Sequence, residues 1–367
     1  MGHSIALNFE DGVTRFIECR PGETIADASY RAGINIPLDC RDGVCGTCKC
    51  RVESGEYDGG DHLEDALTDQ EAAEGLALAC QTRPKTDLVV AIAASSEACK
   101  TGGQTYRARL RSVDRLSETT IAFSLDGVDA FTFLPGQYVN VLVPSTDERR
   151  SYSFSSPPGA EALSFLVRNI PPGVMSTFLR EKAVPGTPVE FIGPAGSFYL
   201  REIKRPLLLL AGGTGLAPFL SMLGKIAETG SAYPIHLVYG VTNDVDLVGI
   251  ERLEQFSTKI PGFTFSTCVA AGDSAQLRKG YVMAHVESGH LNGGDVDVYL
   301  CGPPPMVDAV RAWLGEQSVT PANFYCEKFS PSGSHVDRQR DRRMCVVTEL
   351  LGRTPSEIER LAEEGVI

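Results

Sequence analysis

The sequence of 367 residues predicts three successive domains: an α+β domain, an antiparallel β-barrel and an α/β domain built on a parallel sheet. Three observations support this order. The first hundred residues carry a strand pattern, a short helix pattern and a cysteine-rich loop. Short apolar runs broken by Gly and Pro follow, which is typical of antiparallel strands. Continuous apolar runs that alternate with helix-length segments come last, which is typical of a parallel sheet.

Changes in composition set the predicted boundaries. The polar, Gly-rich segment Lys100–Gln104 ends the first domain, and the apolar run that begins at Leu207 belongs to the third. The charged stretch 330–343 is typical of a flexible linker. The segment Thr354–Glu357 begins with an N-cap residue and then a Pro, which predicts a short last helix. The expected limits are 1–100, 101–203 and 204–330 for the three domains and 331–367 for the linker and C-terminal helix.

The first domain begins with apolar residues that alternate over Ile5–Phe9, followed by the turn pair Asp11–Gly12, so a strand and a hairpin are expected. Thr24 and Asp27 resemble a capping box and Gly33 suits a C-cap, which predicts a short helix between them.

The barrel is expected to contain strands at Ile121–Leu125, Tyr138–Val143, Ser151–Phe154, Leu163–Val167 and Val189–Ile192. The parallel sheet is expected to contain strands at Leu207–Leu210, Ile235–Tyr239, Phe263–Val269 and Val296–Cys301.

Charge and hydropathy disfavour two classes of partner. The formal net charge is −13, and the first hundred residues hold 18 acidic and 9 basic side chains, which argues against nucleic-acid binding. The acidic first domain can serve solubility or dock a basic partner, and composition alone favours solubility. Apolar runs such as Leu207–Ala211 are far shorter than the roughly 20 residues of a membrane span. Residues 1–11 carry no secretory signal. We therefore expect a cytoplasmic protein that binds neither nucleic acid nor membrane.

Four cysteines have the spacing of a metal site. Cys40-x4-Cys45-x2-Cys48, with Cys80 much later, matches the plant-type spacing for a [2Fe–2S] cluster, in which three thiolates come from one loop and the fourth from elsewhere. Zinc is the alternative, but it usually takes cysteines in two separate pairs. The spacing therefore favours the cluster.

The neighbouring residues support the same site. Gly43 and Gly46 suit a loop that wraps tightly around a cluster, and Cys50 is expected to face the core as a small apolar residue. The segments Leu38–Cys48 and Leu78–Gln81 resemble plant-type ferredoxins, which implies a β-grasp fold for the first domain.

Three segments of the second domain together resemble the flavin-binding barrel of the ferredoxin–NADP reductase superfamily: Pro135–Tyr138, Arg150–Ser153 and Val167–Ser176. The four residues Arg150–Ser153 alone fit an ordinary strand equally well, so the context carries the inference.

The resemblance implies that Arg150 pairs with a flavin phosphate, Tyr152 stacks on the isoalloxazine ring and Ser153 bonds near N5. The backbone of Gly173–Ser176 would meet the pyrophosphate, which favours FAD over FMN. The expected contacts in this segment are Val167, Gly173, Met175 and Ser176.

Two segments of the third domain point to a dinucleotide. Gly212–Phe219 follows an apolar strand and opens a helix, so its backbone suits a pyrophosphate. It is not the G-x-G-x-x-G fingerprint of general dehydrogenases. Together with Tyr299–Met306 it resembles the same reductase superfamily, and this resemblance places Cys301 beside the nicotinamide C4. The expected nucleotide contacts are Gly213, Thr214, Gly215, Pro218, Cys301, Gly302, Pro303 and Met306, whereas Cys268 and Cys326 are expected to be small buried residues.

The choice of nucleotide follows from the segment after the second parallel strand. A 2′-phosphate is usually met there by Arg or Lys, but Gly240–Asp246 contains neither, which favours NADH. Asn243 or Asp244 is expected to face the ribose. By resemblance, Phe324–Phe329 forms the last strand, with Glu327 near the nicotinamide and Phe329 on the flavin face opposite Tyr152. Ser153, Cys301 and Glu327 are thus the expected catalytic residues.

The domain order over about residues 4–330 resembles the reductase component of benzoate-type ring-hydroxylating dioxygenases. This resemblance implies an NADH-dependent oxidoreductase that passes electrons from NADH through FAD and the [2Fe–2S] cluster to a terminal non-haem iron oxygenase, and a monomer is the plain expectation. One alternative is the reductase of a diiron monooxygenase of the phenol hydroxylase type. A non-enzymatic redox sensor is the other. Residues 344–367 look similar to the C-terminus of family III CoA-transferases, and their role is unknown.

Overall fold

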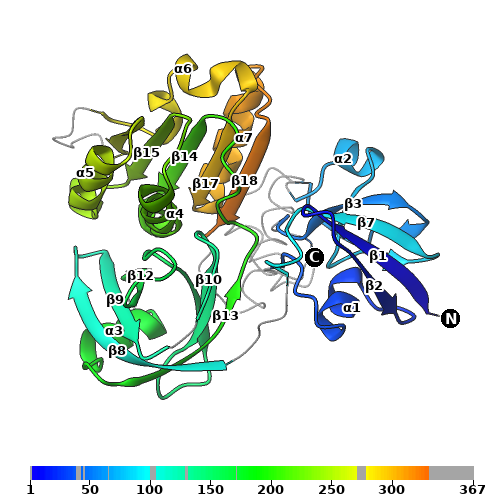
Figure 1. The fold of residues 1–367 in the computed structure, drawn as a ribbon, viewed down its shortest axis with the longest axis horizontal. Coiled ribbons are helices and arrows are strands. Elements are labelled where there is room, and N and C mark those ends of the chain that lie inside the picture. The colour runs from blue at the N-terminus through cyan, green and yellow to red at the C-terminus, as the bar shows by residue number, and fades with distance from the viewer. Residues whose placement is uncertain are drawn as a thin grey trace, which may run out of the picture. The chain divides into compact units, whose positions relative to one another are not determined.

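The computed structural model describes residues 2–38, 43, 46–64, 66–99, 105–128, 131–170, 172–270 and 278–329. Within these residues the chain forms three main sheets of five, six and five strands and a two-stranded ribbon (Figure 1). All of them belong to one compact unit, Met1–Phe329. The predicted linker and C-terminal helix, in 331–367, lie outside the described residues.

The first sheet has the strand order β2-β1-β7-β3-β5. The predicted hairpin is confirmed, because β1 (His3–Phe9) runs antiparallel to β2 (Thr14–Cys19), while β1 runs parallel to β7 (Leu88–Ile92). The predicted helix is also confirmed: α1 (Ile25–Arg31) begins after Thr24, whose side chain accepts a hydrogen bond from the Asp27 N–H. The other elements are β3 (Lys49–Ser54), β4 (Tyr57–Asp58), α2 (Asp69–Ala73), β5 (Leu76–Leu78) and β6 (Arg83–Pro84).

The second sheet is the predicted antiparallel barrel. Its order is β11-β10-β13-β8-β9-β12, and an isolated antiparallel bridge between Phe154 and Phe165 joins the two ends. Phenylalanines fill its core, including Phe123, Phe154 and Phe165, which are almost completely buried. The elements are β8 (Thr105–Arg115), β9 (Thr120–Asp126), β10 (Tyr138–Leu142), β11 (Arg149–Ser153), β12 (Leu163–Arg168), α3 (Val174–Glu181) and β13 (Pro188–Ala195).

The third sheet is parallel throughout, with the order β16-β15-β14-β17-β18. The chain leaves β14 toward one edge of the sheet and returns at β17 toward the other. The carboxyl ends of β14 and β17 therefore form a topological switch point, where open α/β sheets bind ligands. The elements are β14 (Leu207–Gly212), α4 (Leu216–Thr229), β15 (Ile235–Val241), α5 (Ile250–Lys259), β16 (Phe263–Val269), α6 (Ser288–Leu291), β17 (Asp297–Gly302), α7 (Pro304–Glu316) and β18 (Asn323–Lys328), with 3₁₀ turns at Gly213–Gly215, Asp244–Asp246, Val282–His285 and Asn292–Gly294.

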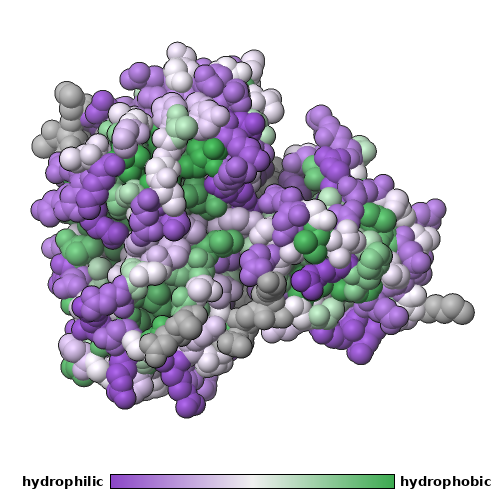
Figure 2. All heavy atoms as spheres, in the orientation of Figure 1, coloured by the Kyte–Doolittle hydropathy of each residue, from purple (hydrophilic) through white to green (hydrophobic). Residues whose placement is uncertain are grey.

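The face of the molecule shown in Figure 2 is mainly hydrophilic, as expected when most apolar side chains are buried in the cores of the sheets. On this face, hydrophilic residues separate small groups of hydrophobic ones. Among the described helices, none is both long enough and apolar enough to cross a bilayer.

Candidate functional site

Strand pairing brings two of the predicted cluster ligands to one place. Cys48 precedes β3 and Cys80 follows β5, and these strands pair antiparallel with Lys49 opposite Leu78. The Ala79 N–H donates to the Cys48 carbonyl oxygen at 3.0 Å, so the two cysteines lie at the same end of the pair. Both side chains are buried, with 3% and 6% exposed. Cys40 and Cys45 lie outside the described residues.

The loop beside these cysteines fits a cluster. Gly43 and Gly46 both have φ of +72°, which disfavours any side chain. A Cβ on Gly43 would lie 2.5 Å from the Asp61 carbonyl oxygen, and one on Gly46 would lie 3.1 Å from that of Ala66. The backbone is therefore folded closely against its neighbours, as a loop around a cluster requires. Cys50 is buried and donates to the Ala77 carbonyl oxygen, as expected for a core residue.

Two of the three predicted catalytic residues, Ser153 and Cys301, contact the carboxylate of the third, Glu327. Ser153 ends β11 in the second sheet, and its Oγ donates to Glu327 Oε2 in β18 of the third sheet at 3.1 Å. The Cys301 Sγ, at the end of β17, donates to the same Oε2 at 3.9 Å. Their exposed fractions are 4% for Ser153, 9% for Glu327 and 0% for Cys301. Burial and the adjacent Glu327 raise the pKa of the Cys301 thiol well above its ordinary value, so this thiol stays protonated at neutral pH.

The predicted flavin residues on β11 have mixed surroundings. Tyr152 packs edge-to-face against Phe123 at 5.8 Å between ring centroids, and burial raises its pKa. Arg150 forms an ion pair with Glu148 and donates to the Arg149 carbonyl oxygen at 2.8 Å. A flavin phosphate at Arg150 would therefore compete with Glu148.

The second flavin segment offers backbone groups rather than side chains. Val167 and Met175 point into the barrel core, and Ser176 Oγ donates to the carbonyl oxygens of Ile170 and Gly173. Gly173 is the N-cap of α3, so the first N–H groups of this helix point out of its N-terminus, where an anion is favoured.

The two glycine motifs of the third sheet meet at the switch point. A Cβ on Gly212 would lie 2.5 Å from Met306 Sδ, and one on Gly302 would lie 2.7 Å from the same sulfur. A Cβ on Gly215 would collide with the Cys301 carbonyl oxygen. Glycine at these positions lets the two strand ends approach each other. In the turn that starts α4, Gly215 is buried, whereas a Cβ on Gly213 would meet nothing within 4 Å, so open space adjoins the backbone there. Thr214 lies in this turn, Pro218 in the first turn of α4, and Pro303 is the N-cap of α7.

The remaining predicted residues of the third domain lie in or just after β15, β16 and β18. Asn243 is exposed, and its backbone and side-chain N–H groups both donate to Asp246 Oδ2. Asp244 follows it in a 3₁₀ turn. The Phe329 N–H donates to the Gly302 carbonyl oxygen at 2.8 Å, which ties the end of β18 to the end of β17. Cys268 is buried as expected, whereas Cys326 is only partly buried.

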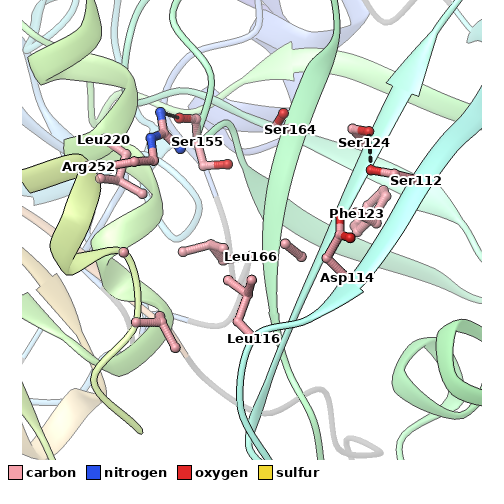
Figure 3. A pocket seen from close by; sticks show the side chains of 13 residues that line it. Ser112, Asp114, Leu116, Phe123, Ser124, Ser155, Ser164, Leu166, Leu220 and Arg252 are labelled. Carbon is pink, nitrogen blue, oxygen red and sulfur yellow. Dashed lines mark hydrogen bonds between the residues drawn. The ribbon is translucent and has the colours of Figure 1, made fainter. Parts of the chain in front are cut away.

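A seam of further contacts joins the second and third sheets. A crevice of about 260 Å³ lies between β8, β9 and β12 on one side and α4 and α5 on the other (Figure 3). Arg252 of α5 crosses it and donates to the Ser155 carbonyl oxygen at 3.0 Å. Thr119 Oγ1 donates to Asp246 Oδ1 across the same seam. The sequence predicted no role for these residues, because single polar residues outside motifs give no local signal.

A further missed residue is Gln137, which is 2% exposed. Its side chain accepts from the Leu134 N–H at 2.9 Å and donates to the Gly196 carbonyl oxygen at 3.1 Å. Its carbonyl oxygen accepts from the Phe154 N–H, so Gln137 fixes the end of β11. Gln137 belongs to the segment Pro135–Tyr138, which resembles the flavin-binding barrel, but the sequence predicted no separate role for this residue.

Comparison with known families agrees with the three sheets. A model of the 2Fe-2S iron-sulfur cluster binding domain matches residues 8–85, a model of the oxidoreductase FAD-binding domain matches 107–199, and a model of the oxidoreductase NAD-binding domain matches 209–312. The structure is similar to Amycolatopsis cytochrome P450 reductase GcoB, with a TM-score of 0.67 and 32% identity over 90% of this chain and 100% of that one. The protein is thus an NADH-dependent oxidoreductase with FAD, a [2Fe–2S] cluster and a ferredoxin reductase-like fold.

Relatives narrow this class further. The chain is 56% identical to the toluate 1,2-dioxygenase electron transfer component of Pseudomonas putida, over 90% of this chain and 100% of that protein. It is 53% identical to the 2-halobenzoate 1,2-dioxygenase component of Burkholderia cepacia, over 90% and 99%. It is 43% identical to the anthranilate 1,2-dioxygenase component of Acinetobacter baylyi, over 91% and 99%. The chain belongs to this family of dioxygenase electron transfer components. The predicted domain limits at 100/101 and 203/204 stay predictions.

Proposed function

We propose that this protein transfers electrons from NADH to the terminal non-haem iron oxygenase of a 1,2-dioxygenase that acts on a benzoate-like aromatic acid. The observation that carries the proposal is the contact of Ser153 and Cys301 with Glu327, where the flavin-type barrel meets the nucleotide-type sheet. The substrate class comes from the relatives, which act with toluate, 2-halobenzoate and anthranilate dioxygenases.

The residues of the chain supply geometry and electrostatics. A bound flavin would supply the exchange between a two-electron hydride and single electrons, and a cluster held by the cysteines would carry these electrons one at a time. Glu327 accepts a hydrogen bond from the Ser153 hydroxyl and so fixes its position at the end of β11. A flavin bound there would have its N5 edge beside this hydroxyl. Cys301, kept neutral by burial, gives the nicotinamide a small uncharged surface beside the same carboxylate. We assign no covalent step to this thiol.

Other residues of the second and third sheets are proposed to contact FAD and the nucleotide. Arg150 is proposed to meet a flavin phosphate in place of Glu148, and Tyr152 to stack on the ring opposite Phe329. The N-terminus of α3, from Gly173 to Ser176, is proposed to meet the pyrophosphate of FAD. The nucleotide is proposed to lie over Gly213–Gly215 at the switch point, with Asn243 or Asp244 at its ribose.

Sequence identity to related reductases helps to choose between a dioxygenase and a monooxygenase as the partner. The reductase component of the propane 2-monooxygenase of Mycolicibacterium goodii is 31% identical to this chain over 90% of its length, against 56% for the toluate dioxygenase component. The higher identity favours a dioxygenase partner over a monooxygenase partner. We further propose that the reductase acts as a monomer in the cytoplasm.

Cytochrome c reduction tests the proposal without the unknown oxygenase. One NADH should reduce two cytochrome c molecules and yield NAD⁺ and one proton, and NADPH should be a much poorer donor. Rapid NADH oxidation without cytochrome c reduction would contradict electron splitting. Absence of NADH oxidation would support the redox-sensor alternative. Adding purified benzoate, toluate and anthranilate oxygenases in turn then identifies the partner by coupled product formation.

A further inference from the structure

Arg201 lies in the connection between β13 and β14 and reaches across to the first sheet. Its Nη1 donates to the carbonyl oxygens of Ser197 at 2.6 Å and Tyr199 at 2.9 Å, within its own connection. Its Nη2 donates to the Ala93 carbonyl oxygen, directly after β7, at 3.3 Å. Its Nε lies 3.7 Å from Glu10 Oε2, directly after β1. The Arg201 side chain is only 14% exposed, so most of the guanidinium is withdrawn from water, whereas Glu10 and the hydrogen bond to Ala93 lie nearer the surface.

The same residue also contacts the third sheet. Its guanidinium stacks over the ring of Tyr325 in β18, with 4.4 Å between the guanidinium carbon and the ring centroid, and over the ring of Tyr199 at 3.7 Å. Its backbone N–H donates to the Tyr299 hydroxyl at 3.1 Å. A guanidinium suits such a junction, because it stays charged, stacks on aromatic rings and donates several hydrogen bonds in one plane.

The segment that Arg201 holds is itself fixed to the first sheet. The Ser95 N–H donates to the Tyr199 hydroxyl at 2.9 Å, which gives a second contact beside Ala93. The next residue, Ser96, donates to Asp11 Oδ2 through both its N–H and its hydroxyl, at 2.8 and 2.7 Å. A displacement at Arg201 is therefore passed to the β1–β7 part of the sheet that carries the cysteine loop.

We propose that Arg201 is a positioning residue for electron transfer: together with Tyr199 it holds the cysteine-bearing domain against the other two sheets, and so sets the rate at which electrons reach the cluster. Its contacts in the third sheet are with Tyr299 and Tyr325 and not with Cys301 or Glu327, so we expect the hydride step to change much less than delivery to the cluster. The inference rests on the proposed route of electrons from NADH through the flavin to the cluster.

Three variants of the full chain test this assignment: Arg201→Ala, Tyr199→Phe and Lys204→Ala. Lys204 is the matched control, because it lies in the same connection and pairs with Glu202 at the surface. Ferricyanide reduction with NADH reports the hydride half, since ferricyanide can take electrons from the flavin, and cytochrome c reduction reports delivery through the cluster. Hydrogen exchange of the Ser95 amide, measured without NADH, reports the contact itself.

Arg201→Ala is expected to lower cytochrome c reduction roughly tenfold, because a misplacement of about 1 Å is costly in a position-dependent step. Ferricyanide reduction should change much less, and the Ser95 amide should exchange faster. Tyr199→Phe removes one oxygen atom from a buried ring, so it tests the contact even if Arg201→Ala folds poorly, and it should change the same two readouts in the same direction by a smaller factor. Lys204→Ala should match the unaltered chain.

Two results would overturn the inference: a parallel loss of both activities in Tyr199→Phe, or unchanged cytochrome c reduction in both Arg201→Ala and Tyr199→Phe. If the unaltered chain itself fails to reduce cytochrome c, the proposed function fails instead. The two failures are therefore distinguishable.

Discussion

The two places where electrons change carrier are built differently. Between the second and third sheets, a buried seam is crossed by Ser153, Thr119 and Arg252, each bonded to a residue of the opposite side. The first sheet meets the rest of the unit through contacts that centre on Arg201 and Tyr199. Hydride transfer requires reacting atoms about 3–3.5 Å apart. The transfer of single electrons does not require such close contact, and its rate depends on the distance that the contacts around Arg201 and Tyr199 set.

The strongest test of this comparison separates the two transfers completely. Cys48→Ser removes a ligand expected to hold the cluster, so cytochrome c reduction should be abolished while ferricyanide reduction with NADH persists. Cys50→Ala is the control, because Cys50 is equally buried but faces the core. Optical spectra confirm loss of the cluster in the first variant only. A matching loss of ferricyanide reduction in Cys48→Ser would show that the two transfers are not independent.

A change on the hydride side should affect both activities together. Ser153→Ala removes the hydroxyl that bonds to Glu327, and both ferricyanide and cytochrome c reduction should fall by about 10²-fold, the usual effect of losing one positioned donor. Ser151→Ala is the matched control, because Ser151 lies on the same strand and bonds to Asn140 at the surface. Stopped-flow reduction of the flavin by NADH measures the step directly. A normal rate in Ser153→Ala would remove Ser153 from the proposed site.

The seam itself can be weakened without touching the site. Arg252→Ala removes a hydrogen bond from a charged donor to the Ser155 carbonyl oxygen, so the free energy of unfolding should fall by about 1.5–3 kcal/mol. Gln255→Ala, on the exposed face of the same helix, should leave it unchanged. Urea unfolding followed by flavin fluorescence measures both. Equal stability of the two variants would mean that Arg252 contributes nothing to the seam.

The last expected effect is a dependence of stability on pH in the third sheet. Burial, then the nearby His290 and Arg278, lower the pKa of His236 to about 4. Unfolding restores a value near 6.5, so the unfolded chain binds more protons between these values. Stability is therefore greatest above about pH 6.5 and falls as the pH drops toward 4.

His236→Gln should flatten this dependence, since the side chain no longer titrates. The glutamine side chain can still form a hydrogen bond with Thr264, whose Oγ1 lies 2.7 Å from Nδ1 of the His236 ring. The measurement is the thermal midpoint between pH 4 and 7 for both proteins. An identical slope for the two proteins would contradict the assignment.

Much of the fold was predictable because its signals are local. The alternation in Ile5–Phe9 and the continuous run Leu207–Leu210 each predict a strand from near neighbours alone, and both strands are present. The cap at Thr24 is likewise local. The long strand β8 and the short helix α2 were missed. Their patterns are weaker, since β8 has only partial alternation and α2 buries none of its residues.

The site, like the fold, has features that local sequence signals predict and features that only long-range contacts decide. By itself, the sequence determined the kinds of chemistry: cysteine spacing indicated the cluster, and glycines after an apolar run indicated a dinucleotide. Only the tertiary structure decided which groups meet. Ser153 and Glu327 are 174 residues apart in sequence, and Arg201 is 108 residues from Ala93. Local patterns depend on neighbouring residues, whereas such contacts depend on strand order, register and the packing of one sheet against another, which no short segment contains.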